Sequence, residues 1–145
     1  MIAVDTNILV YAHRRDMPFH HQALAALRSC AEGQRTWALL WPTLHELLAV
    51  VTNPRIFRRP STLEQALAQL REWLRAPTVH VLGESPRHLD TLADVLRSSA
   101  VVGAKVHDAR IAALCIDHGV RELWSADRDF SRFPELRVVN PLVAA

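Results

Sequence analysis

Acidic side chains directly follow two predicted strands of the chain. Asp5 comes after the short apolar run Ile2-Ala3-Val4, and Asp127 comes just after the run that ends at Ser125, with Asp129 two residues further on. Ligands of open parallel sheets bind in the crevice outside the carboxyl ends of the strands, so these carboxylates are candidates for one common site. Each also has a purely structural interpretation, because Asp5 could cap the next helix and the other two could be turn residues.

A further acid, Asp108, belongs to a helix that we predict from about residue 107 to residue 118. The residues three, four and seven positions later are all apolar, so Asp108 lies on the inward stripe, whereas Arg110 and Asp117 are expected to face water. A carboxylate on an inward stripe must be paired, hydrogen-bonded or metal-bound, because isolated burial of its charge is very costly. The alternative is that the helix N-terminus alone stabilises it.

Glu46 gives the opposite pattern. On its predicted helix it lies across from the stripe formed by Leu44, Leu47, Leu48 and Val51. Periodicity alone therefore describes Glu46 as a surface side chain, and only the surroundings of that face can give it a role.

Several carboxylates that converge without basic partners are stable together only with a hard divalent cation, and Mg²⁺ or Mn²⁺ suits such oxygen ligands. The neighbouring polar residues Thr6, Asn7 and Ser125 could hold metal-bound waters or a phosphate oxygen. A site of this kind activates water and neutralises charge on a phosphodiester, which predicts nuclease chemistry.

Strands and helices alternate along the chain, which is typical of an α/β fold. We therefore predict a parallel sheet of four to five strands with helices on both faces, in a single domain over residues 1–145. The predicted strands are residues 2–4, 36–41, 78–82, 121–125 and 137–139. The predicted helices begin near residues 7, 20, 42, 61, 85 and 107. Ser61-Thr62-Leu63-Glu64 has the pattern of a capping box.

The composition excludes several classes of protein. The chain has 145 residues, half of them hydrophobic, and a net charge of +2, which is incompatible with intrinsic disorder. With only 4 Gly and 2 Cys, neither a collagen-like chain nor a disulfide scaffold is expected. Without a recognisable signal peptide or an apolar run long enough to cross a bilayer, we expect a cytoplasmic protein with no membrane contact.

Four segments in order resemble the motifs of PIN-domain ribonucleases, and the resemblance extends over essentially the whole chain. The first three are Ile2-Ala3-Val4-Asp5-Thr6-Asn7, the helix that carries Glu46, and Val106-His107-Asp108-Ala109-Arg110. The fourth is Ser125-Ala126-Asp127-Arg128-Asp129-Phe130, where the first position is commonly Thr in the family. Within this family the chain is most similar to the VapC toxins of type II toxin–antitoxin modules, in particular to mycobacterial-type members.

The resemblance implies a site and a function. Asp5, Glu46, Asp108 and Asp127 correspond to an acidic quartet that binds Mg²⁺, with Mn²⁺ as the other possible ion. Thr6, Asn7 and Ser125 correspond to supporting polar groups, and Asp129 corresponds either to a fifth acid or to a supporting residue that orients the loop. The family likeness further implies a homodimeric endoribonuclease that cleaves tRNA, rRNA or mRNA and that a VapB-type antitoxin inhibits.

An RNA substrate needs a basic approach, and Arg55, Arg58 and Arg59 lie between the second and third acidic motifs. They could contact RNA, or they could meet the antitoxin, or they could be an ordinary solvated loop. Two other functions stay open from the residues alone. One is a PIN-like RNA-binding module with weak or lost catalysis. The other is a receiver-like phospho-acceptor domain, which would need an acid pair at the end of the first strand.

Overall fold

A single sheet of five parallel strands forms the centre of the molecule, in the order β3-β2-β1-β4-β5. The computed structural model describes residues 1–143. The strands are β1 Ile2–Val4, β2 Trp37–Leu40, β3 Val79–Leu82, β4 Glu122–Trp124 and β5 Arg137–Val139. All neighbouring pairs are parallel, so the carboxyl ends of the strands lie at the same edge of the sheet.

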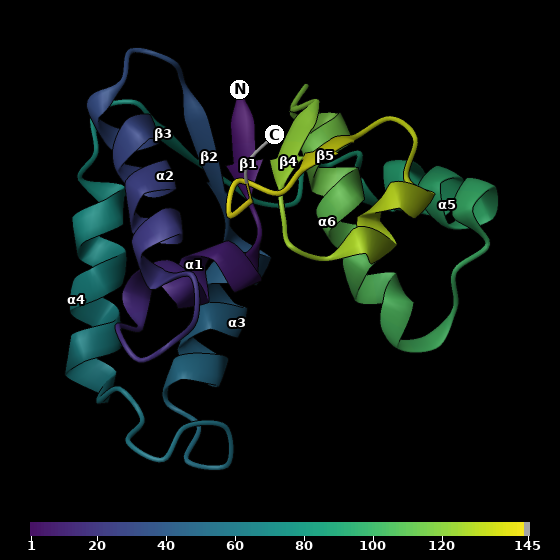
Figure 1. Cartoon of the computed structure of the whole chain (residues 1–145). Coiled ribbons are helices and arrows are strands. Elements are labelled where there is room, and N and C mark those ends of the chain that lie inside the picture. Colours follow the sequence, from purple (N-terminus) through teal and green to yellow (C-terminus); the bar gives the residue numbers. More distant parts are fainter. Residues whose placement is uncertain (144–145) are drawn as a thin grey trace.

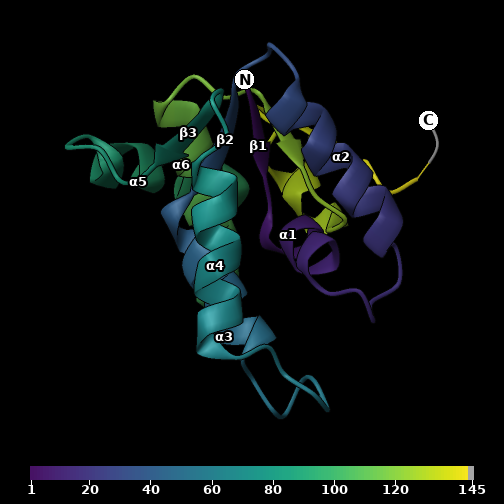
Figure 2. The same cartoon turned by 90° about the vertical axis from the view of Figure 1, so that its left-hand side faces the viewer.

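Helices cover both faces of this sheet, as Figure 1 shows. The α-helices are α1 Thr6–His13, α2 His20–Glu32, α3 Trp41–Val51, α4 Leu63–Leu74, α5 His88–Ser99 and α6 Val106–Asp117. Two short 3₁₀ turns are η1 Gly103–Lys105 and η2 Arg128–Arg132. On one side of the sheet, α2 and α4 form the outer surface (Figure 2). The predicted α/β class, with helices on both faces of the sheet, is therefore confirmed.

The alternation of side chains in the strands builds two separate cores. In β2, Trp37 and Leu39 pack with residues of α1 to α4, whereas Ala38 and Leu40 pack with residues of α5 and α6. All four are buried, because a strand inside a covered parallel sheet has apolar neighbours on both faces. The strands are consequently fixed from both sides, and their carboxyl ends form a rigid edge.

The strand order reverses at β1. This strand pairs with β2 on one side and with β4 on the other, so the connections that follow β1 and β4 leave in opposite directions. Crevices at such switch points are where open α/β sheets bind ligands. Asp5 follows β1 and Asp127 follows β4, so both sequence positions open onto this crevice.

The N-terminus of α4 differs from the prediction by one residue. Thr62 rather than Ser61 is the N-cap, and Gln65 rather than Glu64 completes the capping box. The Ser61 hydroxyl instead forms hydrogen bonds with the ring of His13, the last residue of α1, and with the guanidinium of Arg14, which follows that helix.

Asp117 also differs from its prediction. Its side chain is about 1 % exposed rather than directed to water, and it accepts hydrogen bonds from Thr91 (2.5 Å) and Ser85 (3.0 Å). The reason is that α5 packs against α6 and covers this position, a contact that helical periodicity does not reveal. None of the helices in residues 1–143 combines the length and the apolar content that a membrane crossing requires.

Candidate active site

Asp5 lies at the end of β1 and caps α1. Its Oδ1 accepts the backbone N–H of Thr6 at 2.8 Å, and its Oδ2 accepts the Ser125 hydroxyl at 2.8 Å and the Asn7 amide at 3.3 Å. Capping and site chemistry are therefore not alternatives for this residue. The Asp5 carboxylate caps α1, and the same hydrogen bonds hold it in position at the site.

Ser125 and Asn7 tie the ends of β1 and β4 together. The Asn7 side chain donates to Ser125 Oγ at 3.3 Å and accepts the backbone N–H of Ala126 at 3.2 Å. Ser125 Oγ also accepts the backbone N–H of Asp127 at 3.0 Å. The polar residues predicted to support the acids thus form one hydrogen-bonded network around Asp5, and this network sets the course of the chain into Asp127.

Glu46 reaches the site from α3. The residue is exposed, as its periodicity predicts, yet it lines the same cavity as Asp5 and accepts the Thr6 hydroxyl at 3.1 Å. The exposed face of α3 is therefore a wall of the site. This placement depends on how α3 lies beside α1, which the sequence pattern of α3 does not contain.

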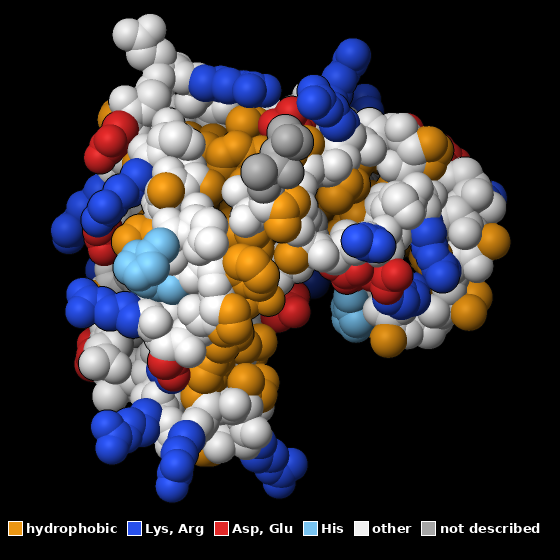
Figure 3. Space-filling view, in the orientation of Figure 1, with side chains coloured by type: hydrophobic (Ala, Val, Ile, Leu, Met, Phe, Trp, Pro, Cys, Tyr) orange, Lys and Arg blue, Asp and Glu red, His pale blue; other side chains and the backbone are white. Residues whose placement is uncertain are grey.

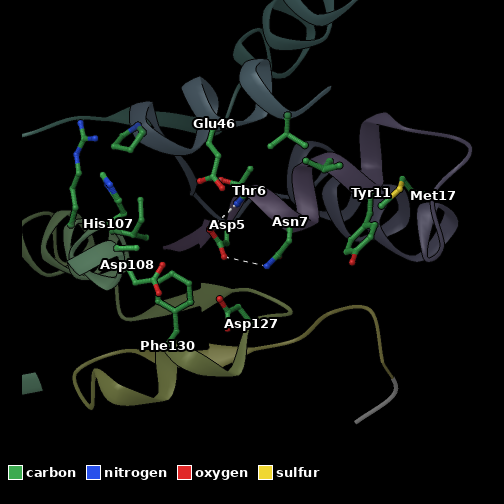
Figure 4. Close-up of a pocket in the computed structure, with 16 residues that line it drawn as sticks. Asp5, Thr6, Asn7, Tyr11, Met17, Glu46, His107, Asp108, Asp127 and Phe130 are labelled. Atoms are coloured by element: carbon green, nitrogen blue, oxygen red, sulfur yellow. Dashed lines mark hydrogen bonds between the residues drawn. The ribbon is translucent and has the colours of Figure 1, made fainter. Parts of the chain in front are cut away.

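The closest group of carboxylates comes from α6 and from the segment after β4. Oxygen atoms of Asp108, Asp127 and Asp129 all lie within 4.8 Å of one another, and we call these residues the aspartate cluster. Asp127 also caps η2 by accepting the backbone N–H of Asp129 at 2.8 Å. Asp108, with its side chain 26 % exposed, is on the cavity wall rather than inside the core. Figure 4 shows Asp108 and Asp127 across the cavity from Glu46.

The expected site residues thus fall into two groups. Asp5 and Glu46 lie on the α1–α3 side, and the aspartate cluster lies on the α6–η2 side. Asp129, for which both a fifth acid and a supporting residue were possible, is part of the aspartate cluster, whereas Asp5 is outside it. All-oxygen ligands at this spacing have the chemistry that Mg²⁺ and Mn²⁺ prefer.

Burial and mutual repulsion shift the ionisation of two acids. Burial raises the pKa of Asp5 from 3.8 to about 6, against the hydrogen bonds from Ser125 and Thr6, and the nearby negative charges add to the increase. The pKa of Asp108 is also raised, first by burial and then by Asp127 and Asp129, although Lys105 opposes the shift. Raised carboxylate pKa values grouped at one cavity indicate a functional site.

The cavity has a volume of about 660 Å³, which is within the range of ligand sites. Figure 3 shows the hollow between the α1 side and the α6 side of the molecule. Hydrophobic side chains predominate on one wall, and acidic and histidine side chains gather on the other. The lining residues outside the predicted set are Val10, Tyr11, Met17, Pro42, Val50, Ala104, His107, Arg110, Ile111 and Phe130.

Several of these lining residues could be identified from their helical spacing to the predicted site residues, although the pattern of acids alone does not indicate them. Tyr11 follows Asn7 by four residues, and Val50 follows Glu46 by four, so each lies on the same helix face as a site residue. Arg110 was expected to face water, but it lies half-buried at the edge of the cavity and pairs with Glu84. That partner is on a loop after β3, and periodicity cannot identify it.

The three arginines lie away from the cavity. Arg55, Arg58 and Arg59 are exposed on the loop between α3 and α4, at the tip of the molecule in Figures 1 and 3. Within residues 1–143 none of them forms an ion pair with an acidic side chain. They are therefore free to meet an external polyanion, but not at the acids themselves.

The PIN domain family model matches residues 2–136 of the chain. The ribonuclease VapC33 of Mycobacterium tuberculosis is 34% identical over 142 residues, which cover 98% of this chain and 99% of that protein. Two solved structures share the fold. VapBC2 of Rickettsia felis, bound to a promoter DNA fragment, has a TM-score of 0.69 at 22% identity and covers 97% of this chain and 98% of its own. The Sarcin-Ricin loop cleaving toxin VapC20 of M. tuberculosis has a TM-score of 0.66 at 19% identity, with coverages of 90% and 93%.

Proposed function

The chain belongs to the PIN-domain family and within it to the VapC ribonucleases, and from this membership we propose that it is the endoribonuclease toxin of a VapBC toxin–antitoxin module. The observation that carries the proposal is the convergence of acids from four parts of the fold on one cavity. Asp5, Glu46, Asp108 and Asp127 all line it.

Mg²⁺ is the proposed cofactor, with Mn²⁺ able to replace it. Asp5 and Asp108 would be the principal ligands, and Asp127 and Glu46 would hold the ion directly or through water. When bound there, a divalent cation would supply water activation and neutralisation of charge on the phosphodiester. No histidine is needed as a general base at such a site, since the carboxylates can accept the proton.

The chain's own residues orient the reaction. The hydrogen bonds from Ser125, Asn7 and Thr6 hold Asp5 in one rotamer and stabilise its ionised form. Glu46, whose Oε2 accepts the Thr6 hydroxyl, would take a proton from the attacking water on its carboxylate. The products are a 5′-phosphate and a 3′-hydroxyl, because the attacking oxygen ends on phosphorus and the 3′ oxygen leaves.

Purified protein mixed with total RNA tests this reaction. We expect new RNA ends that ligate as 5′-phosphates, and a loss of cleavage in Asp108→Asn with RNA binding retained. Binding without cleavage by the unmodified protein, in either Mg²⁺ or Mn²⁺, would instead support the catalytically weak RNA-binding module. The receiver-like alternative is set aside, because the family match covers residues 2–136 and the first strand ends in the single acid Asp5.

The partner follows from the same membership. We propose that a VapB-type antitoxin covers the acidic cavity, because VapBC2 of Rickettsia felis and a toxin–antitoxin complex of Klebsiella pneumoniae share this fold. A homodimer and a cytoplasmic location are also proposed. Co-expression with the open reading frame next to this gene, followed by size-exclusion chromatography, tests the partner and the oligomeric state together.

A further inference from the structure

The only lysine of the chain lies against the aspartate cluster. Lys105 ends the 3₁₀ turn η1 and is the N-cap residue of α6, three positions before Asp108. Its ammonium contacts the Asp129 carboxylate and lies 3.7 Å from Asp108 Oδ2. Within residues 1–143, it is the one basic side chain that forms an ion pair with any member of the cluster.

The Lys105 ammonium lies where a bound metal ion would neutralise the aspartate cluster. Three carboxylates within 4.8 Å of one another repel strongly, and Lys105 reduces that repulsion for all three, Asp127 included. The contact also holds the pKa of Asp129 below its ordinary value. The cluster is thus partly neutralised by the chain itself.

The Lys105 ammonium is able to move away from the aspartate cluster. Its side chain is 40% exposed, and the flexible four-carbon stem with a strongly hydrated ammonium moves into water at little cost. Its backbone, in contrast, is fixed at the start of α6, so the ammonium stays within reach of Asp108 and Asp129.

We propose that Lys105 is an internal counter-ion of the aspartate cluster, and that a divalent cation binds there by displacing the lysine ammonium rather than by filling a free site. This inference rests on the proposed function, whose divalent ion has Asp108 and Asp127 in common with the aspartate cluster. Metal binding is then an exchange of cations. Lys105 lowers the affinity for the metal, and it stabilises the cluster in the metal-free protein.

Calorimetric titration with MgCl₂ and MnCl₂ tests the exchange without any activity measurement. We expect Lys105→Met to lower Kd for the metal by about two- to fivefold, in line with the modest strength of a partly exposed ion pair. Lys105→Arg keeps the charge and is expected to stay within twofold of the unmodified protein. Arg110→Met is the matched control, because it removes one positive charge at the same cavity from a side chain that is paired with Glu84 instead.

A second readout follows Lys105 directly. As the sole lysine, it is the one side-chain amine that an amine-reactive ester can label, and digestion with mass spectrometry separates its peptide from the labelled N-terminal amine. Saturating Mg²⁺ is expected to increase the labelling rate relative to NaCl of equal ionic strength, since the displaced ammonium is no longer held by Asp129.

The outcomes separate the two proposals. If the unmodified protein binds neither Mg²⁺ nor Mn²⁺, the proposed metal-dependent function itself fails. If it binds metal but Lys105→Met binds no more tightly than Arg110→Met, or if Mg²⁺ leaves the labelling rate unchanged, the counter-ion inference is overturned while the proposed function stands.

Discussion

The Ser125 hydroxyl donates a 2.8 Å hydrogen bond to Asp5, and it thereby joins the carboxyl ends of the adjacent strands β1 and β4 across 120 positions of sequence. The bond connects the parallel pairing of β1 and β4 to the chemistry of the site. Parallel pairing brings the two strand ends together, and the hydroxyl then fixes the carboxylate that follows β1.

Replacement of Ser125 tests this relationship. Ser125→Ala removes a hydrogen bond that lowers the pKa of Asp5, so a smaller fraction of Asp5 is ionised at pH 7. We expect kcat/KM for RNA cleavage to fall about tenfold, the effect of one hydrogen bond to a charged group. Ser125→Thr retains the hydroxyl and is the control. Equal loss in the Ala and Thr variants would show that the hydroxyl does not act through Asp5.

The stability of the metal-free protein should depend on pH through Asp5. Its pKa is about 6 in the folded chain against 3.8 ordinarily, so between these values the folded state holds a proton that the unfolded state has lost. Stability from this group is complete below about pH 4 and is lost as pH rises through about 6. We expect the free energy of unfolding of the unmodified protein, relative to Asp5→Asn, to fall by about 1–3 kcal/mol from pH 4 to pH 7.

Urea unfolding in EDTA measures this difference. Asp5→Asn is the appropriate reference, because it removes the titrating group and leaves the other acids and the histidines in place. A difference that does not change with pH, or that grows as pH rises, would contradict the raised pKa.

Much of the site could be predicted from the sequence. Asp5 and Asp127 follow apolar strand runs, and parallel strands necessarily bring such positions to one edge. Asp108 could be identified because a carboxylate among apolar helix positions must be paired, hydrogen-bonded or metal-bound. These residues were identifiable because each is defined by local periodicity together with one general rule of sheet topology.

The remaining features depend on contacts between distant segments. The sequence pattern of α3 describes Glu46 only as an exposed helix residue. Its place at the cavity becomes apparent when α3 is packed beside α1. Asp117 has a surface pattern on α6 but is covered by α5. At the start of α4, Ser61 and Thr62 both fit a capping pattern. Thr62 is the N-cap, because the Ser61 hydroxyl is hydrogen-bonded to His13 and Arg14 at the end of α1.

Arg14 anchors the basic loop between α3 and α4. Its guanidinium donates to the Arg59 carbonyl at 2.8 Å, contacts Ser61, and lies 4.0 Å from the centre of the Phe57 ring. Because Arg14 is only 9% exposed, Arg14→Met leaves these partners without their donor, and we expect a loss of about 1–3 kcal/mol in the free energy of unfolding. Thermal or urea denaturation measures the loss. Arg15→Met, at an exposed neighbouring position, is expected to change stability by less than about 0.5 kcal/mol. Equal effects of the two variants would rule out the anchoring role.

Substitution of Arg58 tests whether the loop between α3 and α4 binds RNA or the antitoxin. The residue is exposed and lies outside the cavity lining, so Arg58→Glu should weaken RNA binding severalfold, most strongly at low salt, without a change in kcat. RNA affinity and antitoxin affinity are measured separately, with Arg97→Glu on α5 as the charge-matched control. If antitoxin affinity alone falls, the loop serves the protein partner and the RNA prediction is wrong.

The central claim is that the acids around the cavity cleave RNA with a divalent cation. Its most direct test is RNA cleavage by the unmodified protein and by Asp5→Asn, in EDTA and after addition of Mg²⁺ or Mn²⁺. We expect no cleavage in EDTA, recovery when either ion is supplied in excess, and little or no recovery in Asp5→Asn. Full cleavage in EDTA, or full activity of Asp5→Asn with Mg²⁺, would contradict it.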